Sequence, residues 1–378
     1  MTKIIGALLF ATAIFGTSAS AQRVAEPPIA AKKPHEIAAP FGATRSDPYY
    51  WLRDDKRQNL EMLSNLNAEN AYADIMLAPL VPLQATVLKE IKSRIKQDDE
   101  SVPYQKNGYF YSSRFEPGAD YPIVARRKGS LAAPEEIMLD QPTMAKGHSY
   151  FDIGVSAVSP DNRLLAYPED VVGRRQYSIK IKDLTTSSLR IDTIANAEPN
   201  LVWADDSKTI FYIDKDPVTL RSTRVKAHVL GTDVAADRLV YEEADDSFYI
   251  SLRRTADDKY LCITLQSTVS NEDRCAAASA PEVFVPIAKR ERDLRYNADH
   301  IGDRWVIRTN LAAPNYKLIT VRDGDVKGGT AQWRDLVPAN SNVFIERFQP
   351  FNGFIAIEER AGGNKRIRLL TNQSERWN

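Results

Sequence analysis

Cysteine and histidine are scarce in this sequence of 378 residues, which contains two cysteines and four histidines. Neither cysteine has a histidine near it in the sequence, so the spacing of a zinc site is absent. A glycine-rich phosphate loop and an EF-hand pattern are absent as well. We therefore expect no metal and no cofactor.

Excess charge of one sign is also absent, because lysine plus arginine and aspartate plus glutamate contribute 50 residues each. Without a basic surplus there is no long-range field to attract nucleic acid or an anionic membrane. We expect neither among the partners of the protein. The hydrophobic content of 43% is that of a globular protein with a core.

The sequence lacks a G-x-S-x-G turn, which exposes the catalytic serine at the top of an α/β-hydrolase sheet. The four histidines, His35, His148, His228 and His300, stand apart from any serine and carboxylate at a spacing that would suggest a triad. Structural or surface roles are the better interpretation for them. We expect no catalytic residue in this chain.

Residues 1–21 have the pattern of a secretory signal peptide. Lys3 gives a positive start, residues 4–15 are apolar, and residues 19–21 form an A-x-A site that predicts cleavage after Ala21. A membrane anchor is the weaker interpretation, because about a dozen apolar residues cannot span roughly 30 Å of hydrocarbon. We expect an exported, periplasmic protein.

Cys262 and Cys275 lie in two strand-like runs on either side of the polar turn at residues 267–270. If the two runs form a hairpin, the cysteines face each other across it, and an oxidising compartment would allow a disulfide. Bridging requires a close, non-hydrogen-bonded pair, because cross-strand Cβ atoms are usually about 4.5 to 5.5 Å apart. A possible disulfide and two buried free thiols both remain open.

Residues 22–100 have the composition of an arm followed by two helices. Residues 27–48 are rich in proline and alanine, which favours an extended arm. Apolar residues then recur at near-helical spacing over 59–77 and again over 83–95, which predicts two amphipathic helices. Between arm and helices, residues 47–55 (DPYYWLRDD) concentrate aromatic rings, and a packing anchor is a better interpretation than a ligand site.

Residues 101–378 consist of short alternating strands separated by polar turns. A turn followed by a strand recurs about every 45 to 55 residues, which is close to the period of a four-stranded propeller blade. The six units begin at residues 107, 161, 205, 257, 302 and 352. We predict a mainly β fold with an incomplete β-propeller over 101–378; a β-sandwich built from the same hairpins is the alternative.

Pairs of aspartates, at residues 205–206, 245–246 and 257–258, coincide with turns or bends of these units. They could suggest a cation site. At such positions aspartates are more often solvated turn caps, because their side chains bond to their own backbone.

The cluster at residues 47–52 resembles the D-P-Y-x-W-L segment of the prolyl oligopeptidase family of serine peptidases. Later segments resemble oligopeptidase B, also called protease II, a member of that family. They are residues 159–162 (SPDN), 173–177 (GRRQY), 182–184 (KDL), 203–209 (WADDSKT), 217–221 (PVTLR), 240–249 (VYEEADDSFY), 309–310 (TN) and 315–318 (NYKL). The resemblance extends from about residue 34 to the end of the chain.

The resemblance implies a seven-bladed propeller that covers an α/β-hydrolase domain and admits short peptides but not folded proteins. In oligopeptidase B the peptide is cut after Arg or Lys, and the arm and helices wrap the catalytic domain. The triad of the family lies in that domain, which has no counterpart here, so we expect this chain alone to be inactive. A catalytic hydrolase domain in cis or in trans would complete it.

A free-standing periplasmic propeller that binds peptides or a protein partner is the alternative function. The sequence leaves open whether the chain is a natural truncation, an expressed fragment or part of a split enzyme. It also leaves open the natural substrate, the oligomeric state, the blade count and the redox state of the cysteines.

Overall fold

The computed structural model describes residues 26–216, 219–373, 376 and 377 and divides the chain into two compact units. The first unit ends at Lys96, and the second begins at Gln97. The expected signal peptide, with its cleavage site after Ala21, lies outside the described residues.

Two consecutive helices are the longest elements of the first unit. The side chain of Asn59 caps the first helix by accepting hydrogen bonds from the backbone N–H groups of Glu61 and Met62, at 3.0 and 3.1 Å. Pro79 lies in the 3₁₀ turn that separates the helices, where its missing N–H interrupts the helical ladder. The elements of this unit are β1 (Glu36–Ala38), β2 (Thr44–Ser46), α1 (Leu60–Leu77), α2 (Val81–Ser93) and three 3₁₀ turns (Pro40–Gly42, Tyr50–Leu52 and Ala78–Leu80).

The aromatic cluster packs on the arm of the same unit. The indole N–H of Trp51 donates to the backbone carbonyl of Ala31 at 2.8 Å, and the Lys33 ammonium lies 4.6 Å from the centre of the indole ring. The ring of Tyr50 stacks on that of His35 with 4.0 Å between centroids. These contacts are those of a packing anchor.

Apolar side chains of the two helices are largely exposed. Met62 is the one buried residue of α1, and α2 has none. The apolar residues of α2 gather on one side, as predicted, whereas those of α1 are distributed around its axis. The prediction of an amphipathic helix is therefore wrong for α1. Among the described residues, the helical run Leu60–Ser93 is long and apolar enough to cross a membrane, although a helix covered by protein meets the same criteria.

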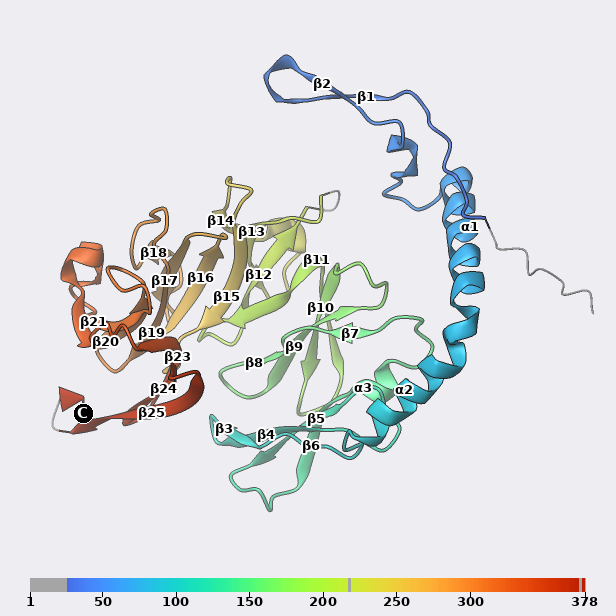
Figure 1. The fold of residues 1–378 in the computed structure, drawn as a ribbon. Helices are drawn as coiled ribbons and strands as arrows, with labels where there is room; N and C mark the ends of the chain where they lie inside the picture. Colours follow the sequence, from blue (N-terminus) through green and yellow to red (C-terminus); the bar gives the residue numbers. More distant parts are fainter. Residues whose placement is uncertain (1–25, 217–218, 374–375, 378) are drawn as a thin grey trace, which may run out of the picture. The chain divides into compact units, whose positions relative to one another are not determined.

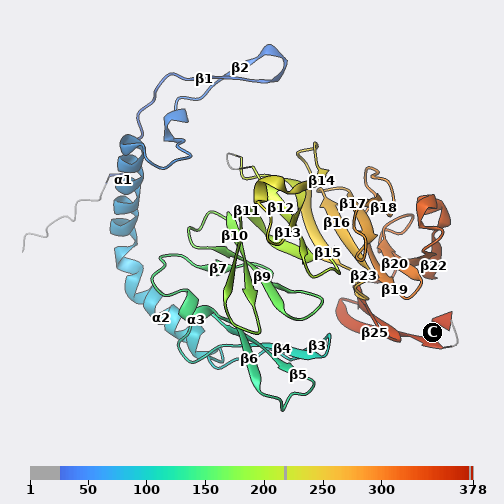
Figure 2. The ribbon, with the colours of Figure 1, turned by 180° about the vertical axis from the view of Figure 1, so that it is seen from behind.

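The second unit consists of antiparallel sheets that follow one another in sequence order around an arc (Figure 1), and the view from behind shows the same order (Figure 2). The first sheet contains β3 (Tyr104–Lys106), β4 (Tyr109–Arg114), β5 (Ile123–Lys128) and β6 (Glu135–Asp140), followed by the short helix α3 (Gln141–Met144). We number the four-stranded units blades 1 to 6 in chain order.

The second sheet has eight strands and comprises two blades. Its strands are β7 (Asp152–Ile153), β8 (Ala157–Val158), β9 (Leu164–Asp170), β10 (Tyr177–Asp183), β11 (Leu189–Trp203), β12 (Thr209–Lys215), β13 (Ser222–Val229) and β14 (Arg238–Glu242). The 15-residue strand β11 joins the two blades, because its first part pairs with β10 and its last part with β12. Blades 2 and 3 therefore share one strand.

Three four-stranded sheets complete the unit. Blade 4 contains β15 (Tyr249–Arg254), β16 (Tyr260–Gln266), β17 (Asn271–Ala277) and β18 (Val285–Pro286). Blade 5 contains β19 (Tyr296–Ile301), β20 (Arg304–Thr309), β21 (Lys317–Arg322) and β22 (Arg334–Val337). Blade 6 contains β23 (Val343–Phe351), β24 (Phe354–Ala361), β25 (Asn364–Gln373) and β26 (Arg376–Trp377). The repeat therefore predicts the described blades correctly, and the architecture is a propeller and not a sandwich.

The hydrophobic core lies between neighbouring blades. Along β16, Leu261 and Ile263 belong to the cluster shared with blade 3, whereas Cys262 belongs to the cluster shared with blade 5. This division follows from the strand period of two, which sends successive side chains to opposite faces of a sheet. None of the five core clusters of described residues joins blade 6 to blade 1.

Candidate functional site at the end of the propeller axis

The turns between the first two strands of the blades gather at one end of the second unit, which we call the turn face. Hydrogen bonds join neighbouring turns, since the Asn162 amide donates to the carbonyl of Asn107 at 3.3 Å and the Asp161 N–H donates to the Ser207 hydroxyl at 3.1 Å. Asn107, Asn162 and Ser207 have positive φ angles of 47°, 63° and 54°. Short polar residues tolerate this conformation, which explains the composition of the turns.

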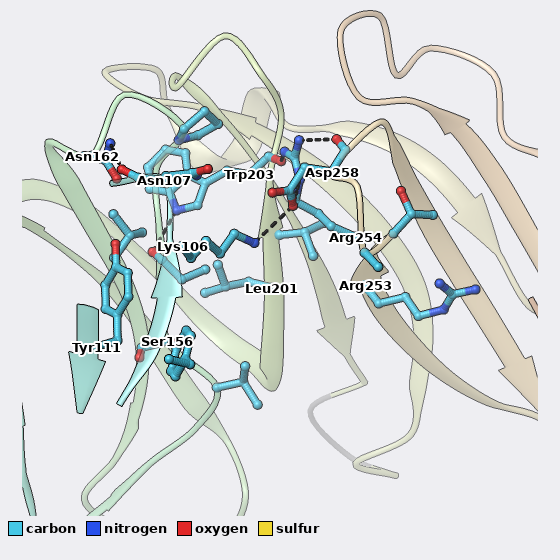
Figure 3. A pocket seen from close by; sticks show the side chains of 18 of the residues that line it. Lys106, Asn107, Tyr111, Ser156, Asn162, Leu201, Trp203, Arg253, Arg254 and Asp258 are labelled. Atoms are coloured by element: carbon cyan, nitrogen blue, oxygen red, sulfur yellow. Dashed lines mark hydrogen bonds and ion pairs between the residues drawn. The ribbon is translucent and has the colours of Figure 1, made fainter. Parts of the chain in front are cut away.

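A cavity of about 1080 Å³ opens beside these turns, between the first strands of blades 1 to 4 (Figure 3). The first strands of the blades surround the central axis of a propeller, so the cavity lies on that axis, at the end that carries the turns. Its walls are mainly apolar, and its rim is charged. The wall includes Tyr104, Tyr111, Val155, Leu201, Trp203 and Leu252.

Two tyrosines form one wall of the cavity. The rings of Tyr104 and Tyr111 stack with 5.3 Å between centroids. Burial raises the pKa of Tyr104, and it also raises that of Tyr111, where a hydrogen bond from Arg126 opposes the effect in part. Both phenols are therefore neutral near pH 7, and they provide an apolar surface with hydroxyl groups at its edge.

Charged groups from three blades connect along the rim. The Lys106 ammonium lies 3.0 Å from the Asp258 carboxylate, which also accepts a hydrogen bond from Nε of Arg254 at 3.2 Å. Arg254 reaches blade 3 as well, where it pairs with Asp205 at 2.5 Å and donates to the carbonyl of Trp203 at 2.7 Å. The rim thus holds a continuous network of alternating charges.

The aspartate pairs have two different roles in the structure. Asp206 caps its own turn, because it accepts bonds from the backbone N–H groups of residues 208 and 209, and Asp245 bonds to the N–H of residue 247. Asp257 does both, because it accepts a bond from the N–H of residue 259 and also binds His300 of blade 5. Asp205 and Asp258 bind side chains of other blades. Interpretation as turn caps is therefore right for Asp206 and Asp245, incomplete for Asp257, and wrong for Asp205 and Asp258.

His300 is fully buried between blades 4 and 5. Its Nδ1 lies 2.6 Å from a carboxylate oxygen of Asp257, and its Nε2 lies 2.8 Å from one of Asp323. The rings of Tyr260 and Trp305 enclose it at centroid distances of 4.7 and 5.1 Å. Since Asp257 comes from the turn of blade 4, this histidine links two blades at the turn face.

The other histidines have structural or surface positions, as expected. His228 is fully buried, and its Nδ1 lies 2.7 Å from a carboxylate oxygen of Asp237, which also accepts a hydrogen bond from Tyr212 at 2.8 Å. His35 stacks on a tyrosine of the arm, and His148 lies at the surface. No group of three or more metal-ligating side chains is arranged as a metal site within residues 26–216 and 219–373.

Cys262 and Cys275 form a disulfide in blade 4. They are direct partners in the antiparallel pairing of β16 with β17, and the turn between these strands lies at residues 267–270. Their Cα atoms are 4.1 Å apart, which is typical of the close, non-hydrogen-bonded type of pair. Of the two possibilities that the sequence leaves open, the structure contains the disulfide.

Lys106 and Arg254 are site residues that the sequence alone does not reveal. Both flank turns of the repeat, at the ends of β3 and β15. A comparison of the charged residues that border each turn could have identified these two residues from the sequence. Their partners still could not be assigned, because Lys106 and Asp258 are 152 residues apart in the chain.

Comparison with protein families gives a match over residues 28–378 to the family model described as the prolyl oligopeptidase N-terminal beta-propeller domain. Among curated proteins, dipeptidyl aminopeptidase BI of Pseudoxanthomonas mexicana is 50% identical over 96% of this chain and 52% of its own length. Protease 2 of Moraxella lacunata is 29% identical over 89% of this chain and 49% of its own length. The chain spans about half the length of the curated relatives it matches.

Two solved structures of oligopeptidase B align with most of this chain. Oligopeptidase B from Leishmania major aligns with a TM-score of 0.83 and 30% identity over 93% of this chain and 51% of its own. Oligopeptidase B from Trypanosoma brucei aligns with a TM-score of 0.82 and 26% identity over 93% of this chain and 52% of its own.

Proposed function

The chain belongs to the prolyl oligopeptidase family, of which it forms the N-terminal propeller portion, and we propose that it controls the access of short peptides to a serine peptidase active site. The observation that carries the proposal is the cavity of about 1080 Å³ at the axial end of blades 1 to 4. A cavity of this size accommodates a small peptide, and its apolar walls with a charged rim suit an extended chain. A folded domain would be excluded.

The catalytic domain belongs, in this proposal, to a further part of the protein or to a separate hydrolase chain. The sequence has no G-x-S-x-G turn, and loss of a triad costs about 10⁴- to 10⁶-fold in rate. The chain alone is therefore expected not to hydrolyse a chromogenic peptide ending in Arg or Lys. Turnover that a serine-reactive inhibitor abolishes would refute this. Reading the DNA downstream of Asn378 for a G-x-S-x-G turn tests the origin of the catalytic domain.

Cleavage after Arg or Lys is the proposed specificity of the complete peptidase. Its support is the similarity to oligopeptidase B and protease 2. An assay of the complete protein on peptides that differ only in Arg, Lys or an uncharged residue before the reporter group tests it.

Release of dipeptides from the amino terminus is a second candidate activity. The identity of 50% to a protein named dipeptidyl aminopeptidase BI favours it. Matched Xaa-Arg reporter peptides with a free or a blocked amino group separate the two activities in the complete protein. Cleavage of the blocked peptide indicates an endopeptidase, and cleavage of the free peptide alone indicates dipeptide release.

Export to the periplasm is proposed from residues 1–21 and is supported by the disulfide, which oxidising compartments favour. Expression of the whole reading frame with its leader, followed by mass measurement of the periplasmic product, is expected to give a chain that begins at Gln22. Retention of residues 1–21 in the cytoplasm would contradict export.

A seventh blade that covers the outer face of blade 6 is also proposed. Ile367 and Leu369 are 73% and 58% exposed there, opposite the face that carries the buried Ile355 and Ile357. The chain alone is expected to self-associate through this face. Ile367→Lys should reduce self-association in size exclusion, whereas the same change at exposed Val283, in blade 4, should not.

A free-standing propeller is the alternative to this proposed function. It predicts a monomer that binds peptides or a protein partner without a hydrolase. Co-purification of the mature chain from periplasmic extract tests the version in trans, because a catalytic partner would then be recovered. A G-x-S-x-G turn encoded downstream of Asn378 would support the version in cis.

A further inference from the structure

Two blades that are not neighbours meet across the cavity. Lys106 lies in β3 of blade 1, and Asp258 lies in the β15–β16 turn of blade 4, yet their charged groups are 3.0 Å apart. Blades 2 and 3 lie between them along the arc. Figure 3 shows the Lys106 side chain extending from its strand towards that carboxylate. We propose that the Lys106–Asp258 pair is a strap across the cavity that limits the size of the molecules reaching its interior.

The two ends of the strap are held differently. Asp258 is fixed, because Arg254 donates to its side chain at 3.2 Å and to its backbone carbonyl at 2.6 Å, and is itself anchored to Asp205 of blade 3. Lys106 has a side chain that is 48% exposed, and among the described residues Asp258 is its one ionic partner. The acceptor is therefore a rigid point, and the lysine is the arm that can leave it.

The strength of the pair suits a strap that opens often. Exposed ion pairs are worth about 0.2 to 1 kcal/mol, which favours the closed form roughly 1.4- to 5-fold over the open form. Salt screens such a pair further. The strap thus slows the entry of bulky molecules without sealing the cavity.

This inference rests on the proposed function where it concerns peptides, because the strap would then favour short and extended substrates. The access that it controls is measurable without any peptidase activity. Failure of the complete protein to cleave peptides would remove the proposed function and leave the strap in place. An access measurement that fails would remove the strap and leave the proposed function in place.

A thiol placed inside the cavity measures access directly. Ser156 lines the cavity and lies, in Figure 3, on the opposite side of Lys106 from the turns. Ser156→Cys gives a single reactive thiol, because the two native cysteines are joined in a disulfide. The probes are a small maleimide and a bulky polyethylene-glycol maleimide, and the rate of each reaction is followed by mass spectrometry on the whole chain.

Removal of the lysine charge is the decisive change. Lys106→Met is expected to accelerate the bulky reagent roughly two- to five-fold and to leave the small reagent unchanged. Lys106→Arg should restore the slow rate. High salt should accelerate the bulky reagent in the unaltered strap and have no effect in Lys106→Met.

Two further variants serve as controls. Asp258→Asn removes the other charge and should reproduce the acceleration; asparagine tolerates the φ of +60° at this turn. Lys317→Met breaks a pair of 2.8 Å to Asp335 within blade 5 and should change neither rate. Equal rates of the bulky reagent with and without Lys106, or an equal rise for both reagents, would overturn the proposal.

Discussion

The disulfide of blade 4 should contribute measurably to the stability of the propeller. Cys262 and Cys275 close a loop with a sequence separation of 13, and both are almost fully buried. In the chain-entropy model, a loop of about 15 residues stabilises the folded state by about 3 kcal/mol, because the unfolded chain loses freedom. With a urea dependence of about 3 kcal/mol per molar, the double change Cys262→Ala/Cys275→Ala should lower the unfolding midpoint by about 1 M.

Tryptophan fluorescence is a suitable probe for this experiment, because Trp305 and Trp333 belong to the same core cluster as the two cysteines. Urea unfolding of the unaltered protein with and without a reductant separates the stabilisation by the cross-link from the destabilisation by the lost volume of the two sulfur atoms. Thiol titration of the denatured, unreduced chain should detect no free thiol. Coincident midpoints for the oxidised and reduced protein would refute the reasoning.

Three other changes probe links between or within blades. His300→Ala removes the buried imidazole that joins Asp257 to Asp323 and should lower stability by about 3 kcal/mol in urea unfolding. Burial alone would raise the pKa of Glu243, but the hydrogen bonds that its carboxylate accepts, first among them the bond from Arg290, lower it. The stabilisation by Glu243 is therefore complete above about pH 4.5 and is lost as the pH falls through the lowered pKa of the folded state. Glu243→Gln should flatten an acid unfolding profile over that pH range. Gly154→Ala would place a Cβ 2.6 Å from that of Pro199 and should lower the melting temperature through about 1 to 3 kcal/mol of strain.

Local patterns in the sequence predict the blades well. Turns such as 161–162 and 257–258 join the strands that the alternation predicts, because asparagine and aspartate fit tight turns wherever they occur. The hairpin of Cys262 and Cys275 is predictable for the same reason, since its turn fixes the register.

Contacts between blades are not encoded in any local pattern. His300 and Asp257 are 43 residues apart, and the pairing of Lys106 with Asp258 depends on the geometry of all three interfaces between consecutive blades from blade 1 to blade 4. The sharing of β11 between two blades was equally hidden, because the repeat suggests separate sheets. The candidate site consists mostly of such contacts, so little of it could be predicted.

The strand β11 makes blades 2 and 3 a single hydrogen-bonded ladder from β7 and β8 to β14. Elsewhere in the described propeller no strand ladder joins neighbouring blades, which are held by side-chain packing and by separate hydrogen bonds and ion pairs that can be loosened one interface at a time. These two blades should instead open as one foldon, with amide protons along β11 exchanging at the slow rate of the whole ladder. One side of the cavity is therefore mechanically stiff, and breathing motions of the propeller concentrate at its other interfaces.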